Sequence, residues 1–98
     1  MYARASTLQG APDQADEAIG SYENALATFR NIDGNRGAFL LIERSSGKGI
    51  GVTLWESKEA MQASRQRADE LRQQAASSTG ASIVSVEEYE VAVWDIGS

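Results

Sequence analysis

Few residues in this chain of 98 could take part in chemistry, because it contains neither histidine nor cysteine. The absence of histidine excludes nucleophilic systems that rely on a histidine base, and it excludes histidine-ligated haem. The absence of cysteine excludes thiolate nucleophiles, and without both residues typical zinc sites are excluded as well. What remains is the chemistry of aromatic rings, carboxylates and arginines. No residue can be assigned a catalytic role, and no metal site is expected. The candidates for binding a substrate are Trp55, Arg4, Tyr22, Tyr89 and Thr53.

Arg4 stands in an otherwise apolar segment, Tyr2 to Leu8, that is predicted to be the first strand. A buried charge requires a partner, and either a ligand anion or a carboxylate such as Glu90 would serve. Arg4 is therefore a candidate for stabilising an anion, while Trp55 and the tyrosines could hold an aromatic ring. Packing in the core is the alternative interpretation for each of these residues.

Two short segments have the composition of a ligand site but favour other interpretations. Glu87, Glu88 and Glu90 could bind a hard cation or supply a general base. Charges along an exposed strand also prevent it from pairing with the edge of another sheet, and we favour this second interpretation. Gly47 to Gly51 suggests a phosphate loop, but it lacks the upstream glycine and the serine or threonine after the lysine. The segment predicts a hairpin turn instead.

The candidates must be positioned by elements that hydrophobic periodicity and turn residues predict. A first helix begins at Pro12, and a second is capped by Ser57 and stopped by Gly80. In the second helix, Met61, Ser64, Ala68, Leu71 and Ala75 are predicted to face the sheet, and residues such as Arg65, Asp69 and Arg72 to face water. The predicted strands are 2–8, 37–44, 50–55 and 82–94, followed by a frayed tail over 95–98.

The element order is therefore β-α-β-β-α-β within a single domain, 1–98. With right-handed crossovers this order predicts an α+β, ferredoxin-like fold: an antiparallel four-stranded sheet with both helices on one face.

The second face of the sheet is predicted to be apolar as well. Phe39 and Leu41 alternate with Ala38, Leu40 and Ile42, so both faces of that strand are hydrophobic. Two helices cover only one face, and monomers seldom expose large apolar patches. We therefore expect a homodimer that packs sheet against sheet.

Charge and composition exclude several partners. With 9 basic and 14 acidic residues the net charge is −5, which disfavours nucleic acid. No apolar run approaches the roughly 20 residues that span a bilayer, and no signal peptide is evident. The absence of cysteine suits a reducing compartment, so we expect a soluble, cytoplasmic protein that binds neither nucleic acid nor membrane.

The segment Thr53 to Met61 resembles the strand-to-helix signature T-x-W-x-S-x-x-A of the antibiotic biosynthesis monooxygenase-like proteins, members of the dimeric α/β-barrel superfamily. The resemblance implies a ferredoxin-like fold, dimerisation through the sheets and a ligand pocket lined by Trp55. Members of the family include cofactor-independent monooxygenases of polycyclic aromatic compounds and haem-degrading enzymes.

The haem-degrading branch needs a histidine on the second helix and an asparagine on the first strand, where this chain has Arg65 or Gln66 and Arg4 or Ser6. The resemblance therefore favours an oxidoreductase without a cofactor, acting on an aromatic or polyketide-like small molecule. The alternative is a non-catalytic dimeric module that binds a small molecule or another protein.

Overall fold

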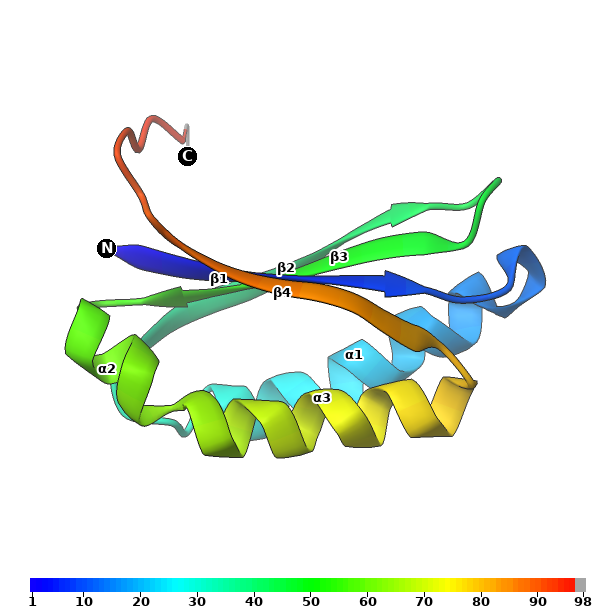
Figure 1. The fold of residues 1–98 in the computed structure, drawn as a ribbon, viewed down its shortest axis with the longest axis horizontal. Helices are drawn as coiled ribbons and strands as arrows, with labels where there is room; N and C mark the ends of the chain where they lie inside the picture. The colour runs from blue at the N-terminus through cyan, green and yellow to red at the C-terminus, as the bar shows by residue number, and fades with distance from the viewer. Residues whose placement is uncertain (97–98) are drawn as a thin grey trace.

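The computed structural model describes residues 1–96 and shows a four-stranded antiparallel sheet with all helices on one side (Figure 1). The strand order is β2-β3-β1-β4, which is the ferredoxin-like fold that the element order predicts. The strands are β1 (Tyr2–Gln9), β2 (Asn35–Glu43), β3 (Lys48–Trp55) and β4 (Ser82–Glu90). The helices are η1 (Pro12–Gln14), α1 (Ala15–Phe29), α2 (Lys58–Ala63) and α3 (Arg65–Thr79).

The second predicted helix is divided at Ser64 into α2 and α3. Ser57 caps α2 as predicted, because its hydroxyl oxygen accepts a hydrogen bond from the Ala60 backbone nitrogen at 3.1 Å. The Ser64 hydroxyl donates to the Met61 carbonyl oxygen at 2.7 Å. A serine side chain bonded to the preceding turn competes with the regular helical pattern, which accounts for the break at this position.

The last strand is shorter than predicted. β4 is an edge strand whose neighbour in the sheet is β1, and Glu90 pairs with Tyr2, where β1 begins. Residues 91–94 therefore have no strand opposite them, apart from one hydrogen bond from the Val91 nitrogen to the Met1 carbonyl oxygen. Of the tail predicted over 95–98, residues 97 and 98 lie outside the described part of the chain.

The β2–β3 connection is the hairpin that the sequence predicts. Gly47 has a φ of +79°, and its carbonyl oxygen accepts a hydrogen bond from the Gly10 nitrogen at 3.0 Å. A Cβ atom on Gly47 would lie 2.3 Å from the Gly10 carbonyl oxygen. The glycine is thus required because the hairpin packs directly onto the end of β1.

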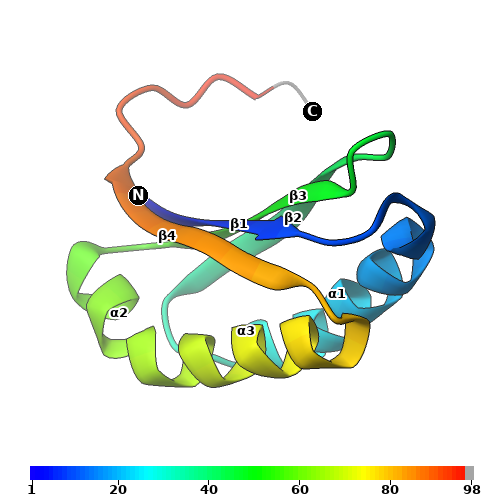
Figure 2. The same ribbon diagram turned by 45° about the vertical axis from the view of Figure 1, so that its right-hand side comes forward.

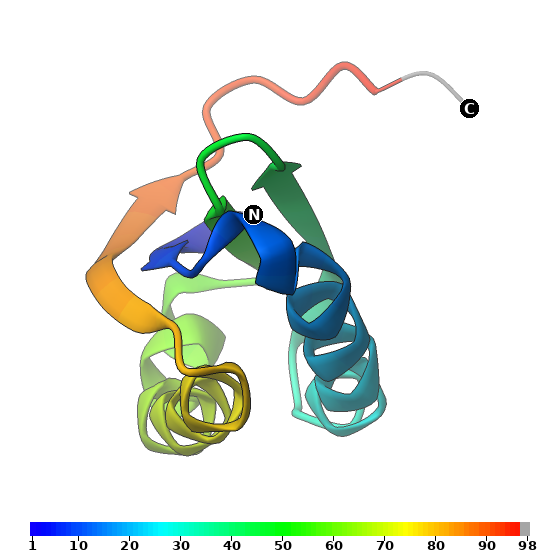
Figure 3. The same ribbon diagram turned by 90° about the vertical axis from the view of Figure 1, so that its right-hand side faces the viewer.

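The two faces of the sheet differ in what covers them. The inner face packs against α1 and α3, which lie side by side beneath it (Figure 3), and the core there is built on Phe29, Ala68 and Leu71. On the outer face, Phe39 and Leu41 remain 42% and 53% exposed, and none of the described helices covers them. Residues 91–96 extend on this outer side (Figure 2). None of the helices within residues 1–96 is long and apolar enough to cross a membrane.

Candidate functional site

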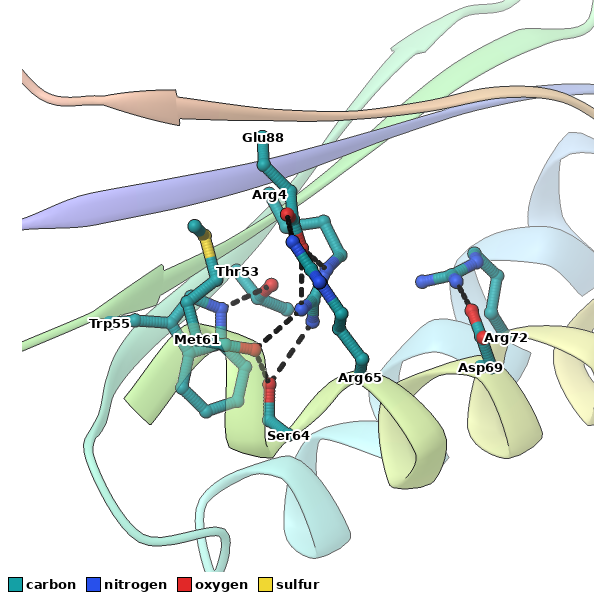
Figure 4. A network of polar contacts seen from close by, with 9 residues as sticks. All are labelled: Arg4, Thr53, Trp55, Met61, Ser64, Arg65, Asp69, Arg72 and Glu88. Carbon is teal, nitrogen blue, oxygen red and sulfur yellow. Dashed lines mark hydrogen bonds and ion pairs between the residues drawn. The ribbon is translucent and has the colours of Figure 1, made fainter. Parts of the chain in front are cut away.

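Arg4 lies on the inner face of β1, is only 3% exposed and is held by four hydrogen bonds (Figure 4). Its Nε and Nη2 atoms donate to Oε2 of Glu88 at 3.0 and 2.8 Å. Nη2 also donates to the Met61 carbonyl oxygen at 2.7 Å, and Nη1 donates to the Ser64 hydroxyl at 3.2 Å. The guanidinium is therefore fixed between β4 and the break that separates α2 from α3.

The carboxylate partner of Arg4 is Glu88, so the suggestion of Glu90 is wrong. The antiparallel register places Glu88 directly opposite Arg4, whereas Glu90 lies opposite Tyr2. Glu87 lies opposite Ala5, on the other face of the sheet. The acidic cluster is therefore split, and no group of three ligands that could hold a metal ion occurs within residues 1–96.

Glu88 also binds Arg65, which reaches it from the first turn of α3. Arg65 Nη2 lies 2.5 Å from Oε1 and Arg65 Nε lies 3.2 Å from Oε2 of Glu88. The hydrogen bond from Arg65 is the largest cause that lowers the pKa of Glu88 to about 2; partial burial opposes it and Arg4 adds to it. Glu88 is consequently a weak base at neutral pH.

Trp55 ends β3 and is fully buried, with none of its surface exposed. Its Nε1 atom donates to Oγ1 of Thr53 at 2.9 Å, and the Arg4 guanidinium carbon lies 5.7 Å from the ring centroid. The tryptophan thus supports Arg4 by a cation–π contact and orients the Thr53 hydroxyl. It lines neither of the two interior cavities described next.

Two cavities of about 40 Å³ each lie between the sheet and the helices. The first, called the Thr53 cavity, has Ser6, Gly51, Thr53 and Arg72 in its wall, and the second reaches Leu40 and Ile42 on β2. Both are bordered by Leu8, Tyr22 and Ala75. Each can hold water molecules, since a single water needs about 10–15 Å³ of such space.

Tyr22 of α1 lines both cavities and lies against the sheet. Its ring packs over Gly51, where an added Cβ atom would lie 3.0 Å from ring atom Cε2. Its hydroxyl lies 2.9 Å from the Phe39 carbonyl oxygen and 3.2 Å from that of Val52, and it donates to these acceptors. Burial raises the pKa of Tyr22 to about 12, so the phenol stays protonated.

The structure brings four of the five sequence candidates to the inner face and separates the fifth. Trp55 contacts both Arg4 and Thr53, which are paired across β1 and β3, and Tyr22 lines the Thr53 cavity together with Thr53. Tyr89 lies opposite Ala3 on the outer face and is 51% exposed. It therefore belongs to the open face of the sheet.

Arg72 is a site residue that the sequence analysis missed, because it was expected to face water. Its side chain is only 10% exposed, forms an ion pair with Asp69 and lines the Thr53 cavity. Burial, and then the charge of Arg4, lower the pKa of Arg72. The signal was present in the sequence, since Ser64, Ala68 and Arg72 recur every four residues on one helix face.

The arrangement suits the binding of a small anionic molecule. Arg72 stands in the wall of the otherwise largely apolar Thr53 cavity, close to the charge of Arg4, and these two positive charges would favour an anion that is shielded from water. The two titratable groups with the largest pKa shifts, Glu88 at about 2 and Tyr22 at about 12, are both poorly suited to accept a proton at neutral pH.

Comparison with known proteins places the chain in a family. The family model described as antibiotic biosynthesis monooxygenase matches residues 1–77. The uncharacterized protein Rv2557 of Mycobacterium tuberculosis is 34% identical over 93 residues, which are 94% of this chain and 41% of that protein. The chain thus spans about two fifths of the length of the curated relatives it matches.

Solved structures share the fold at low sequence identity. A candidate antibiotic biosynthesis monooxygenase from Deinococcus radiodurans has a TM-score of 0.73 at 18% identity, covering 99% of this chain and 100% of its own. A monooxygenase of Streptomyces coelicolor, in complex with nanaomycin D, has a TM-score of 0.73 at 15% identity, covering 99% of this chain and 92% of its own. Because the family model covers most of the chain, this protein belongs to the antibiotic biosynthesis monooxygenase family.

Proposed function

We propose that this protein is a cofactor-independent monooxygenase that oxidises a hydroxylated aromatic or polyketide-like molecule bound between the sheet and the helices. The observation that carries the proposal is the position of Arg72 in the wall of the Thr53 cavity, close to the charge of Arg4. Membership of the family supports the reaction class, and the Streptomyces coelicolor monooxygenase that shares the fold is in complex with nanaomycin D, which is consistent with a small-molecule substrate.

In this reaction the substrate supplies the electrons. The deprotonated substrate reduces dioxygen by four electrons, and a ring methylene, present as such or in the keto tautomer of a hydroxylated ring, becomes a carbonyl. One atom of dioxygen forms the carbonyl oxygen, and the other leaves as water together with the two hydrogens of the methylene. The protein would orient the ring, exclude water and stabilise the anion with the charges of Arg4 and Arg72. Thr53 Oγ1, held by Trp55, would contact a ring oxygen.

The acidity of the substrate replaces a general base in this proposal. Glu88, with a pKa of about 2, and Tyr22, with a pKa of about 12, are poor proton acceptors at neutral pH. Substrates whose hydroxyl group ionises more readily should therefore react faster. The value of kcat/KM should rise with pH, reach half of its maximum at the substrate's own pKa and level off above it.

A polycyclic ring is larger than the two cavities, since ligand pockets usually exceed about 300 Å³. Binding therefore requires Tyr22 or the helices to move and join the two spaces. We treat the chain as one domain over 1–98. It would bind the substrate as part of a homodimer in which the outer faces of two sheets pack together. The exposed Phe39 and Leu41 support this pairing.

Oxygen consumption and product mass, measured with a panel of hydroxylated aromatic compounds, test the proposal. We expect turnover by the wild type and a loss of about tenfold or more in kcat/KM for Arg72→Gln. Arg67→Gln is the matched control, because Arg67 lies on the same helix but is 51% exposed and pairs with Glu70. No oxygen consumption above that of heat-denatured protein would refute the enzymatic role, and equal rates in both variants would refute the role of Arg72.

A further inference from the structure

A surface cleft of about 320 Å³ lies beside the Thr53 cavity and is lined by Arg4, Arg65, Asp69, Arg72, Val86 and Glu88. We call it the arginine cleft. Arg72 lines both the cleft and the Thr53 cavity, so its side chain stands between the surface and the interior. In Figure 4 the Arg72 guanidinium extends from α3 toward the side of the Arg4–Glu88 pair.

The arginine cleft carries an excess of positive charge in an acidic protein. Three arginines face two carboxylates there, although the chain as a whole has a net charge of −5. Glu88 is shared by Arg4 and Arg65, which leaves Asp69 as the ion-pair partner recorded for Arg72. Asp69 is 64% exposed, and an ion pair with so exposed a carboxylate contributes little stability.

The chemistry of the cleft matches a carboxylate monoanion. A planar guanidinium binds a carboxylate through two parallel hydrogen bonds, so a ligand carboxylate can take the place of Asp69 on Arg72. One negative charge would balance the one positive charge in excess, whereas a phosphate dianion would be repelled by Glu88 and Asp69. The volume of the cleft also falls within the range of small-ligand sites.

We propose that the arginine cleft is the carboxylate subsite and the entrance of the Thr53 cavity, so that the substrate is an aromatic carboxylic acid. Its carboxylate displaces Asp69 from Arg72 and contacts Arg65, while its ring passes Arg72 into the interior. This inference rests on the proposed function for the identity of the ring-binding space. It adds the class of substrate and names Arg72 and Arg65 as the residues that select it.

Binding measurements test the subsite without requiring turnover. Isothermal titration calorimetry at pH 7.5 would compare 6-hydroxy-2-naphthoic acid with 2-naphthol, which has the same ring system and hydroxyl group but no carboxylate. We expect the acid to bind the wild type about tenfold more tightly or better, because bidentate carboxylate recognition by arginine is strong in a partly desolvated cleft.

Two variants should change the affinity for the acid in opposite directions. Arg72→Gln should abolish the preference for the acid, whereas Asp69→Asn should raise its affinity about threefold because the competing carboxylate is removed. Arg67→Gln and Glu70→Gln are the charge-matched controls, since this exposed pair lies on the same helix away from the cleft. Both controls should bind the acid as the wild type does, and circular dichroism would verify that each variant is folded.

The outcomes separate this inference from the proposed function. Equal affinity for the acid and the naphthol, or equal effects of Asp69→Asn and Glu70→Gln, would overturn the subsite even if oxygen is consumed. Tight binding of the acid that depends on Arg72, without oxygen consumption, would support the subsite and refute the oxygenase. If neither compound binds, the subsite is overturned, and oxygen consumption with the panel alone decides the oxygenase.

Discussion

At the scale of single residues, the defining feature is a buried arginine whose guanidinium is held in place by four hydrogen bonds. Arg4 is 3% exposed and bonds to Glu88, Ser64 and the Met61 carbonyl. Removing one partner of such a pair costs more than the pair itself contributes, because the remaining charge is left buried without compensation. Loss of either partner of the Arg4–Glu88 pair should therefore weaken the attachment of β4 to the α2–α3 break by more than the net stabilisation that the pair contributes.

We predict that Glu88→Gln lowers the free energy of unfolding by about 2–3 kcal/mol, because Arg4 would keep its charge and lose its carboxylate. Urea denaturation measures the change. Glu90→Gln is the control: Glu90 is an exposed neighbour on the same strand, and its substitution should change stability by less than about 0.5 kcal/mol. Equal effects of the two substitutions would contradict the role assigned to Glu88.

The same pair predicts a dependence of stability on pH. The pKa of Glu88 is lowered to about 2 in the folded protein, below the ordinary value of 4.5, so its contribution is present above pH 4.5 and is lost as the pH falls toward 2. Allowing for solvent screening of this partly exposed group, we expect a loss of roughly 1–2 kcal/mol over that range. Thermal unfolding of wild type and Glu88→Gln should therefore converge as the pH falls from 5 to 2.

At the scale of elements, the hairpin and the broken helix determine where the site residues stand. The hairpin contacts the end of β1 through Gly47 and Gly10, and the break at Ser64 begins α3 with Ser64 beside Arg4. The four-residue spacing along α3 then brings Ala68 and Arg72 to the same side as Ser64. Arg72 reaches the Thr53 cavity because α3 packs with this side toward the sheet.

We predict that Gly47→Ala destabilises the protein by about 2 kcal/mol or more. The substituted residue would have to keep a φ of +79° with its Cβ atom 2.3 Å from the Gly10 carbonyl oxygen. Gly20→Ala is the control, because no atom lies within 4 Å of a Cβ atom placed there in α1. This control should stabilise the protein by about 0.5–1 kcal/mol, and chemical denaturation of both variants distinguishes the two effects.

At the scale of the whole molecule, the sheet presents one covered and one open face. The helices bury the inner face, while Phe39, Leu41 and Tyr89 remain about half exposed on the outer one. Exposed apolar residues collected on one flat surface are typical of an interface. A second copy of the same sheet would cover them and enclose both outer faces.

We predict that Leu41→Glu converts a dimer into a monomer. A charge placed at the centre of an apolar interface is left without a partner, so association should weaken by a factor of about 100 or more. Light scattering with size exclusion at micromolar concentration measures the mass. Gln73→Glu adds the same charge at an exposed position on α3 and should leave the dimer intact. A wild-type mass equal to that of one chain would refute the dimer.

The sequence by itself determined the order of the elements, the cap at Ser57, the hairpin at Gly47 and the two-sided apolar character of β2. These features depend on periodicity and on the conformational preferences of residues close together in the chain. They were sufficient to predict the ferredoxin-like fold and to place Arg4 and Thr53 as candidates on its strands.

Only the tertiary structure decided which groups meet in the site. The β1–β4 register shifts by one residue between Thr7 and Leu8; without this shift Arg4 would lie opposite Glu87 instead of Glu88. Such a shift is set by long-range pairing and packing, which local patterns do not record. The same packing buries Arg72, because it fixes how α3 is rotated against the sheet.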